Sequence, residues 1–98
     1  MKKYTDLYVV CKYERWSQYW FKSLLNYILA YESSELVARY NSRERSITLT
    51  NHDQLYTVRF VSENWFEKCR DGHDCVMLDW CDGEVKDLYV KIRNTFWK

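Results

Sequence analysis

The chain has no proline and only two glycines, Gly72 and Gly83, among its 98 residues. Few positions can therefore interrupt a helix or a strand, and no segment has the composition of a linker or a repeat. Apolar residues make up 47% of the chain, which is enough to bury the surface that offsets the entropy lost on folding. We expect a single compact domain over residues 1–98, in which almost every segment belongs to regular structure.

The N-terminal part of the chain changes from a strand pattern to a helix pattern. Residues 4–11 hold a short continuous apolar run, which is typical of a strand covered on both faces. Residues 17–31 carry apolar side chains at steps of three and four and predict a helix. Ser33 and Ser34 interrupt that pattern, and residues 35–40 form a short candidate strand. The predicted apolar stripe of the helix consists of Trp16, Tyr19, Trp20, Leu24, Tyr27, Ile28 and Tyr31, widened by Phe21, Leu25 and Leu29.

Two alternating segments in the middle of the chain predict a β-hairpin. Apolar and polar residues alternate over residues 46–50 and again over residues 55–61. Asn51, His52 and Asp53 lie between them and tolerate turn conformations, although the usual turn glycine is missing. We therefore expect two antiparallel strands.

The C-terminal part predicts a short helix, a strand and a longer helix. Ser62 is suited to cap a helix that continues to Lys68, and Gly72 marks a loop before a strand at residues 74–79. Asp82 is a candidate cap for the last helix, whose apolar face consists of Val85, Leu88, Tyr89, Ile92 and Phe96. The order of elements predicts an α/β (or α+β) domain: a mixed four- to five-stranded sheet with two main helices and one short helix.

Residues 45–79 combine, in order, a strand pair with a turn at 51–53, a basic loop at 68–72 and an apolar strand that ends in Asp79. This order resembles the ATPase core of phage terminase large subunits. Those proteins typically have an Asn-Gly turn, an Arg-Gly loop and a strand ending in Asp-Glu. The resemblance implies a degenerate P-loop NTPase core in which Asp79 matches the magnesium-binding acid. Residues 7–11 and 17–31 resemble the strand and the helix on either side of the phosphate-binding loop.

The chain departs from that family at the residues that carry catalysis. Trp80 stands where the catalytic glutamate is expected, and residues 12–16 contain no glycine. A phosphate-binding loop needs glycines so that its backbone N–H groups can point at the phosphates, whereas Tyr13, Glu14 and Trp16 would fill that concavity. His52 also replaces the turn glycine. The sequence therefore predicts neither an enzyme nor a bound cofactor, and we expect Asp79 to cap the following segment or to pair with an arginine.

Aromatic side chains indicate a binding role instead. The chain has five tryptophans and nine tyrosines, more than a small core needs, and these residues are favoured at interfaces. We predict a small protein-binding or inhibitor protein, of the kind that a phage or mobile element encodes against a host or viral defence or replication factor. Alternatively, Trp16 and Trp20 lie on the buried stripe. The predicted partner-binding residues are Tyr13, Arg15, Trp16, Tyr19 and Trp65.

Two further hypotheses stay open beside protein binding. A nucleic-acid-binding protein would use Arg39, Arg43, Arg45 and Arg59 on phosphates, with tyrosines stacking on bases, although the acidic stretch at 71–87 argues against a broad groove. A degenerate nucleotide-binding protein is the second alternative.

The cysteines and the absence of long apolar runs suggest where the protein works. We expect the four cysteines to be reduced thiols in the cytoplasm, which would be the host cytoplasm for a phage protein. No segment resembles a secretion signal or approaches the length needed to span a bilayer, so no membrane partner is expected. A zinc site would use Cys69, His73, Cys75 and Cys81, but these residues lack the paired Cys-x-x-Cys spacing.

Overall fold

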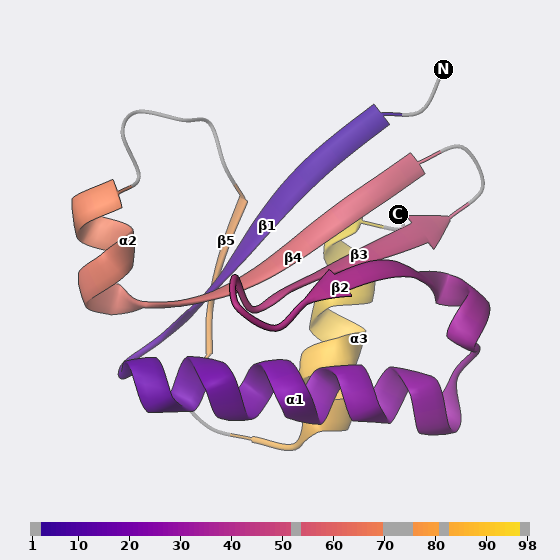
Figure 1. Cartoon of the computed structure of the whole chain (residues 1–98), viewed down its shortest axis with the longest axis horizontal. Helices are drawn as coiled ribbons and strands as arrows, with labels where there is room; N and C mark the ends of the chain where they lie inside the picture. Colours follow the sequence, from indigo (N-terminus) through magenta and orange to yellow (C-terminus); the bar gives the residue numbers. More distant parts are fainter. Residues whose placement is uncertain (1–2, 52–53, 70–75, 81–82, 97–98) are drawn as a thin grey trace.

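A mixed five-stranded sheet forms the centre of the molecule (Figure 1). The computed structural model describes residues 3–51, 54–69, 76–80 and 83–96. The strands are ordered β2-β3-β4-β1-β5 across the sheet. Their bounds are β1 Lys3–Cys11, β2 Val37–Asn41, β3 Ser46–Asn51, β4 Gln54–Ser62 and β5 Val76–Asp79. The central strand β1 is parallel to both neighbours, β4 and β5, whereas β2, β3 and β4 pair antiparallel. The predicted mixed sheet, with the 4–11 segment as a central strand, is confirmed.

Helices cover the two faces of the sheet unequally. The long helices α1 (Glu14–Tyr31) and α3 (Val85–Phe96) pack on one face, and the short helix α2 (Glu63–Cys69) packs on the other. A one-turn 3-10 helix, η1 (Ser34–Leu36), leads from α1 into β2. The predicted pair of main helices and one short helix is confirmed.

The main core lies between the sheet and helices α1 and α3. Side chains alternate between the two faces of a strand, so every second residue of β1, β3 and β4 faces the helices. Side chains three and four residues apart share one side of a helix, so α1 and α3 each bury one stripe against the sheet. The buried members of this core include Leu7, Val9, Phe21, Leu24, Ile28, Ile47, Leu49, Val58, Phe60, Leu88 and Ile92. The opposite face carries a smaller cluster of Val10, Val61 and Phe66, with Tyr8 and Trp65 packed against it.

The carboxyl ends of β1, β4 and β5 lie at one edge of the sheet because the three strands are parallel. Helix α1 follows β1 and helix α2 follows β4, so both helices begin at this edge, on opposite faces. Figure 1 shows both helices starting at the left of the view. The turn between β2 and β3 reaches the same edge, since β3 begins opposite the end of β4.

The element boundaries differ from the sequence prediction at two helices. Helix α1 begins at Glu14 rather than residue 17, and the predicted strand at 35–40 is divided between η1 and β2. Four residues of α1 that were predicted on the apolar stripe are exposed, because the buried stripe is narrower than predicted: Trp16, Tyr19, Leu29 and Tyr31. The predicted Ser62 cap is confirmed: its Oγ accepts a hydrogen bond of 3.1 Å from the backbone N–H of Trp65. The predicted turn residues His52 and Asp53, the Gly72 loop and the Asp82 cap lie outside the described residues.

Candidate functional surface

The first turn of α1 is held rigidly against the end of β1. Only Lys12 and Tyr13 link the strand to the helix. The carbonyl of Tyr13 accepts hydrogen bonds from the backbone N–H groups of Trp16 and Ser17, and the buried Ser17 hydroxyl donates to the carbonyl of Glu14 at 2.6 Å. Side chains in this turn therefore project from a fixed backbone.

Large aromatic side chains are exposed on that turn and the next. Tyr13, Trp16 and Tyr19 are 49%, 41% and 54% exposed. The cations of Lys12 and Arg15 lie 5.6 and 5.5 Å from the centre of the Tyr13 ring, within the range of a cation–π interaction. We name Lys12, Tyr13, Arg15, Trp16 and Tyr19 the helix-start surface.

A chain of ring contacts connects the helix-start surface to the core. Trp16 meets Tyr19 edge to face at 5.9 Å, and Tyr19 meets the buried Trp20 at 5.0 Å. Trp20 in turn meets the buried Trp80 at 5.4 Å, and Lys91 of α3 lies 5.2 Å from the Trp80 ring. Of the two tryptophans that could have lain on the buried stripe, Trp20 does so and Trp16 does not. Ring contacts thus connect Trp16 and Tyr19 to the core.

The β2–β3 turn supports the same helix from the side. Asn41 Oδ1 accepts hydrogen bonds from the backbone N–H groups of Arg43 and Glu44, and Arg45 has a left-handed backbone with φ 54°. The turn directs Arg45 to Glu14 of α1, with 3.4 Å between Nη1 and Oε1. This ion pair neutralises the acidic residue next to the helix-start surface.

A basic hollow of about 350 Å³ adjoins that ion pair. Gln18, Phe21 and Lys22 of α1 line one side of it, and Ser42, Arg43 and Arg45 of the turn line the other. The helix-start surface therefore continues into further positive charge.

Trp65 does not belong to the helix-start surface. It lies in α2 on the opposite face of the sheet, where its ring stacks on Tyr8 at 6.0 Å and Arg59 lies 4.8 Å from its centre. The prediction grouped residues that flank one edge of the sheet but project to different sides of it. Tyr13, Arg15, Trp16 and Tyr19 remain together.

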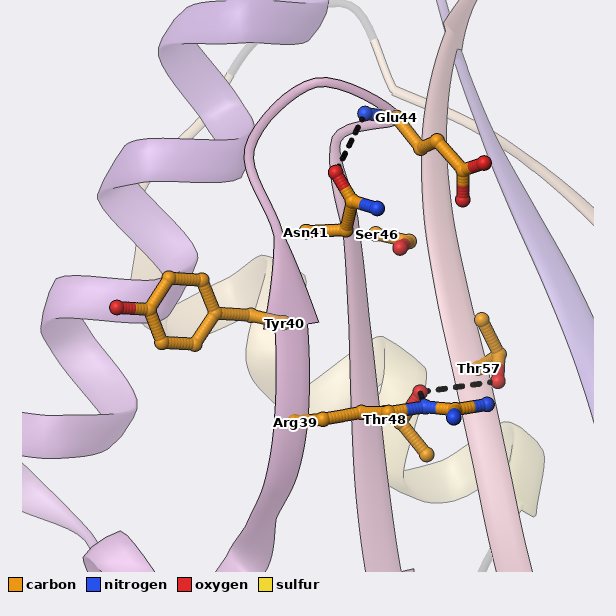
Figure 2. A pocket seen from close by; sticks show the side chains of 7 residues that line it. All are labelled: Arg39, Tyr40, Asn41, Glu44, Ser46, Thr48 and Thr57. Atoms are coloured by element: carbon orange, nitrogen blue, oxygen red, sulfur yellow. Dashed lines mark hydrogen bonds between the residues drawn. The ribbon is translucent and has the colours of Figure 1, made fainter.

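On the sheet face that carries α2, the side chains over β2, β3 and the adjoining part of β4 are polar (Figure 2). We name Asp6, Arg39, Glu44, Ser46, Thr48, Thr57 and Arg59 the open sheet face. Two adjoining hollows of about 330 and 100 Å³ lie on it and share Glu44, Ser46 and Thr57. The hydroxyls of Thr48 and Thr57 are hydrogen-bonded at 3.2 Å, and Arg39 Nε donates to Thr48 Oγ1 at 3.5 Å. Figure 2 shows the Arg39 side chain beside these threonines and Tyr40 pointing away from them.

The four arginines predicted for nucleic-acid binding do not form one patch. Arg39 and Arg59 lie on the open sheet face, where the carboxylates of Asp6 and Glu44 line the same hollows. Arg43 and Arg45 line the basic hollow on the α1 side, and Arg45 is paired with Glu14. The sequence reasoning missed the open sheet face, although the polar residues that alternate with Ile47, Leu49, Val58 and Phe60 could have revealed it.

Two other predicted sites stay untested. Cys69 ends α2, and its side chain and those of His73, Cys75 and Cys81 lie outside the described residues, so the zinc hypothesis stays a prediction. Asp79 ends β5 and is exposed, and no hydrogen bond or ion pair to its carboxylate is found within the described part of the chain. Its predicted capping of the following segment falls on residues 81–82, which are not described.

Among the residues that the structure describes, no helix is long and apolar enough to cross a membrane. Comparisons with protein families, with curated proteins and with solved structures found no match for this chain.

Proposed function

We propose that this protein acts by binding another protein through the helix-start surface. The observation that carries the proposal is that Tyr13, Trp16 and Tyr19 are each about half exposed, and that ring contacts connect Trp16 and Tyr19 to the core. Tryptophan, tyrosine and arginine are the residues most enriched at binding hot spots. Rigid aromatic side chains lose little conformational entropy when they bind, which favours affinity.

Nucleotide hydrolysis has less support. A phosphate-binding loop of the P-loop type spans eight residues between a strand and a helix, whereas Lys12 and Tyr13 alone separate β1 from α1. A link this short, with a bulky Tyr13 side chain, supports the proposal that any likeness to a terminase ATPase core is one of architecture and not of activity.

Nucleic-acid binding also has less support than protein binding. A groove for a polyanion needs cations along a continuous path. Here Arg39 and Arg59 share their face with Asp6 and Glu44, and Arg45 is already paired with Glu14.

A pull-down with a matched control tests the proposal. The double variant Trp16→Ala/Tyr19→Ala removes two exposed rings and leaves the buried Trp20 in place. Tyr31→Ala is the control, because Tyr31 is a 77% exposed tyrosine at the other end of the same helix. We expect proteins captured by the wild type to be retained by Tyr31→Ala and lost by the double variant, with mass spectrometry as the readout and circular dichroism as the check on folding. Equal capture by wild type and double variant would contradict the proposal.

A further inference from the structure

The charges around the helix-start surface are unbalanced. Lys12 and Arg15 stand on it, and Lys22 and Arg43 line the adjoining basic hollow. Within the described residues, no carboxylate lies within ion-pair distance of any of these four cations, and the one ion pair found, between Arg45 and Glu14, neutralises the acid that lies among them. These four cations therefore have no carboxylate partner among the described residues.

Two carboxylates near this edge of the sheet, those of Glu44 and Asp79, belong to its other side. Glu44 lines the hollows of the open sheet face. Asp79 is in register with Val10, whose side chain packs in the small cluster beside α2, so Asp79 shares that face. The sheet thus separates these acids from the helix-start surface.

The exposed rings form a shape suited to an apolar side chain. Trp16 and Tyr19 lie 5.9 Å apart with an angle of 86° between their planes. A face of one ring and an edge of the other border the space beside them, and an aliphatic or aromatic side chain can contact both. From this shape and the unbalanced charge, we propose that the partner segment is an acidic peptide region with an apolar residue between its carboxylates, an inference that rests on the proposed function.

The same geometry disfavours a single-stranded nucleic acid as the occupant. Successive bases stack on ring faces that lie roughly parallel along the strand. Perpendicular rings on one helical turn cannot stack two neighbouring bases at once. Carboxylates of a protein segment, by contrast, can reach Lys12 and Arg15 while its apolar side chain contacts Trp16 and Tyr19.

The test is a selection from a randomised peptide library displayed on phage, with the full chain as the target. We expect enriched peptides to carry an excess of Asp and Glu on either side of an aromatic or aliphatic residue. A synthetic copy of one enriched peptide is then titrated against variants by fluorescence polarisation, at low and at high salt.

Two charge reversals at matched positions measure the contribution of charge. Arg15→Glu changes the second residue of α1, and Lys86→Glu changes the second residue of α3. Both residues are exposed, and an acid in the first turn of a helix is favoured by the helix dipole, so both variants should fold. We expect Arg15→Glu to weaken peptide binding about tenfold and Lys86→Glu to leave it within about twofold. Added salt should weaken binding to the wild type more than to Arg15→Glu.

The outcomes separate this inference from the proposed function. Peptides that lose binding with Trp16→Ala but show no acidic excess and no effect of Arg15→Glu would overturn the inference and leave the proposed function standing. Peptides indifferent to Trp16→Ala, or no enriched peptide at all, would contradict both. A single-stranded oligonucleotide that binds more tightly than any selected peptide and depends on Trp16 would also overturn the inference, in favour of nucleic acid.

Discussion

The helix-start surface and the open sheet face lie on opposite sides of the same sheet and differ in which side chains they combine. On the open sheet face, arginines share hollows with carboxylates and the hydroxyls of Thr48 and Thr57 bond to each other. On the helix-start surface, aromatic rings and cations contact each other but leave large apolar areas and positive charge exposed. The open sheet face therefore combines charges of both signs with hydroxyls, whereas the helix-start surface combines exposed apolar area with positive charge, a composition suited to a partner.

Removing the buried Trp20 ring, which contacts the helix-start surface, should have the largest effect on the free energy of unfolding. Trp20→Ala is expected to lower the free energy of unfolding by about 3–5 kcal/mol, because it leaves a large cavity in the main core. Trp65→Ala, on the other side of the sheet, removes a half-buried ring and should cost about 1–2 kcal/mol. Urea unfolding of both variants measures the difference. Equal losses would show that the two sides of the sheet are supported to the same extent.

Substitution of Gly83 should disturb the packing of Trp80 against Trp20. Gly83 has φ +134°, and a β-carbon there would lie 2.9 Å from Cη2 of Trp80, a buried ring that contacts Trp20. Gly83→Ala is expected to cost about 2–4 kcal/mol through backbone strain and this clash. It should also shift the tryptophan fluorescence of the native state. The exposed Ser42→Ala serves as the control substitution. An unchanged melting temperature would mean that Trp80 is not held in this position.

The paired hydroxyls of Thr48 and Thr57 on the open sheet face should contribute to stability and not to partner binding. Thr48 is buried, with 4% of its surface exposed, and its hydroxyl is 3.2 Å from that of Thr57. Thr48→Val should cost about 1 kcal/mol, and the double variant Thr48→Val/Thr57→Val less than the sum of the two single changes. A double-mutant cycle by thermal unfolding measures this coupling. Loss of partner capture in these variants would count against the assignment of binding to the helix-start surface.

The buried hydroxyl of Tyr89, on the face of the sheet that α1 and α3 cover, has no hydrogen-bond partner among the described residues. Tyr89 is buried and its OH makes no hydrogen bond there, so Tyr89→Phe should change the free energy of unfolding at neutral pH by no more than about 1 kcal/mol, towards greater stability. Burial, helped by the nearby charge of Glu32 and opposed by Arg93, raises the pKa of Tyr89 above its ordinary value of 10.0. The unfolded chain therefore releases this proton at lower pH than the folded protein does. Wild-type stability should fall as the pH rises above 10.

The pH dependence of the variant provides the check. Tyr89→Phe lacks the ionising group, so its unfolding midpoint in urea should fall less than that of the wild type above the ordinary tyrosine pKa. Parallel curves for the two proteins would show that the Tyr89 hydroxyl is not buried as described.

The sheet, the hairpin and the three helices could be predicted because their patterns depend on local periodicity. Alternation over residues 46–50 and 55–61 gave β3 and β4, and the three-and-four spacing gave α1 and α3. Ser62 could be identified as a cap because its role depends only on the residues that follow it.

The candidate site could be predicted only in part, because its composition depends on which face of the sheet each element covers. Tyr13, Arg15, Trp16 and Tyr19 are close in sequence and stay together on one helix. Trp65 lies apart from them because α2 packs on the opposite face of the sheet. No local sequence pattern indicates on which face a helix packs. The pairing of Arg45 with Glu14 joins a turn to a helix across the fold and was likewise beyond sequence reasoning.

The central claim is that binding belongs to the helix-start surface and not to the open sheet face. The most direct measurement is the affinity of one selected peptide for the wild type, Trp16→Ala and Arg39→Ala. We expect Trp16→Ala to weaken binding by about 30-fold or more, as the loss of a hot-spot residue does, and Arg39→Ala to change it by less than about twofold. Weaker binding by Arg39→Ala with Trp16→Ala unaffected would contradict the account and assign the site to the open sheet face.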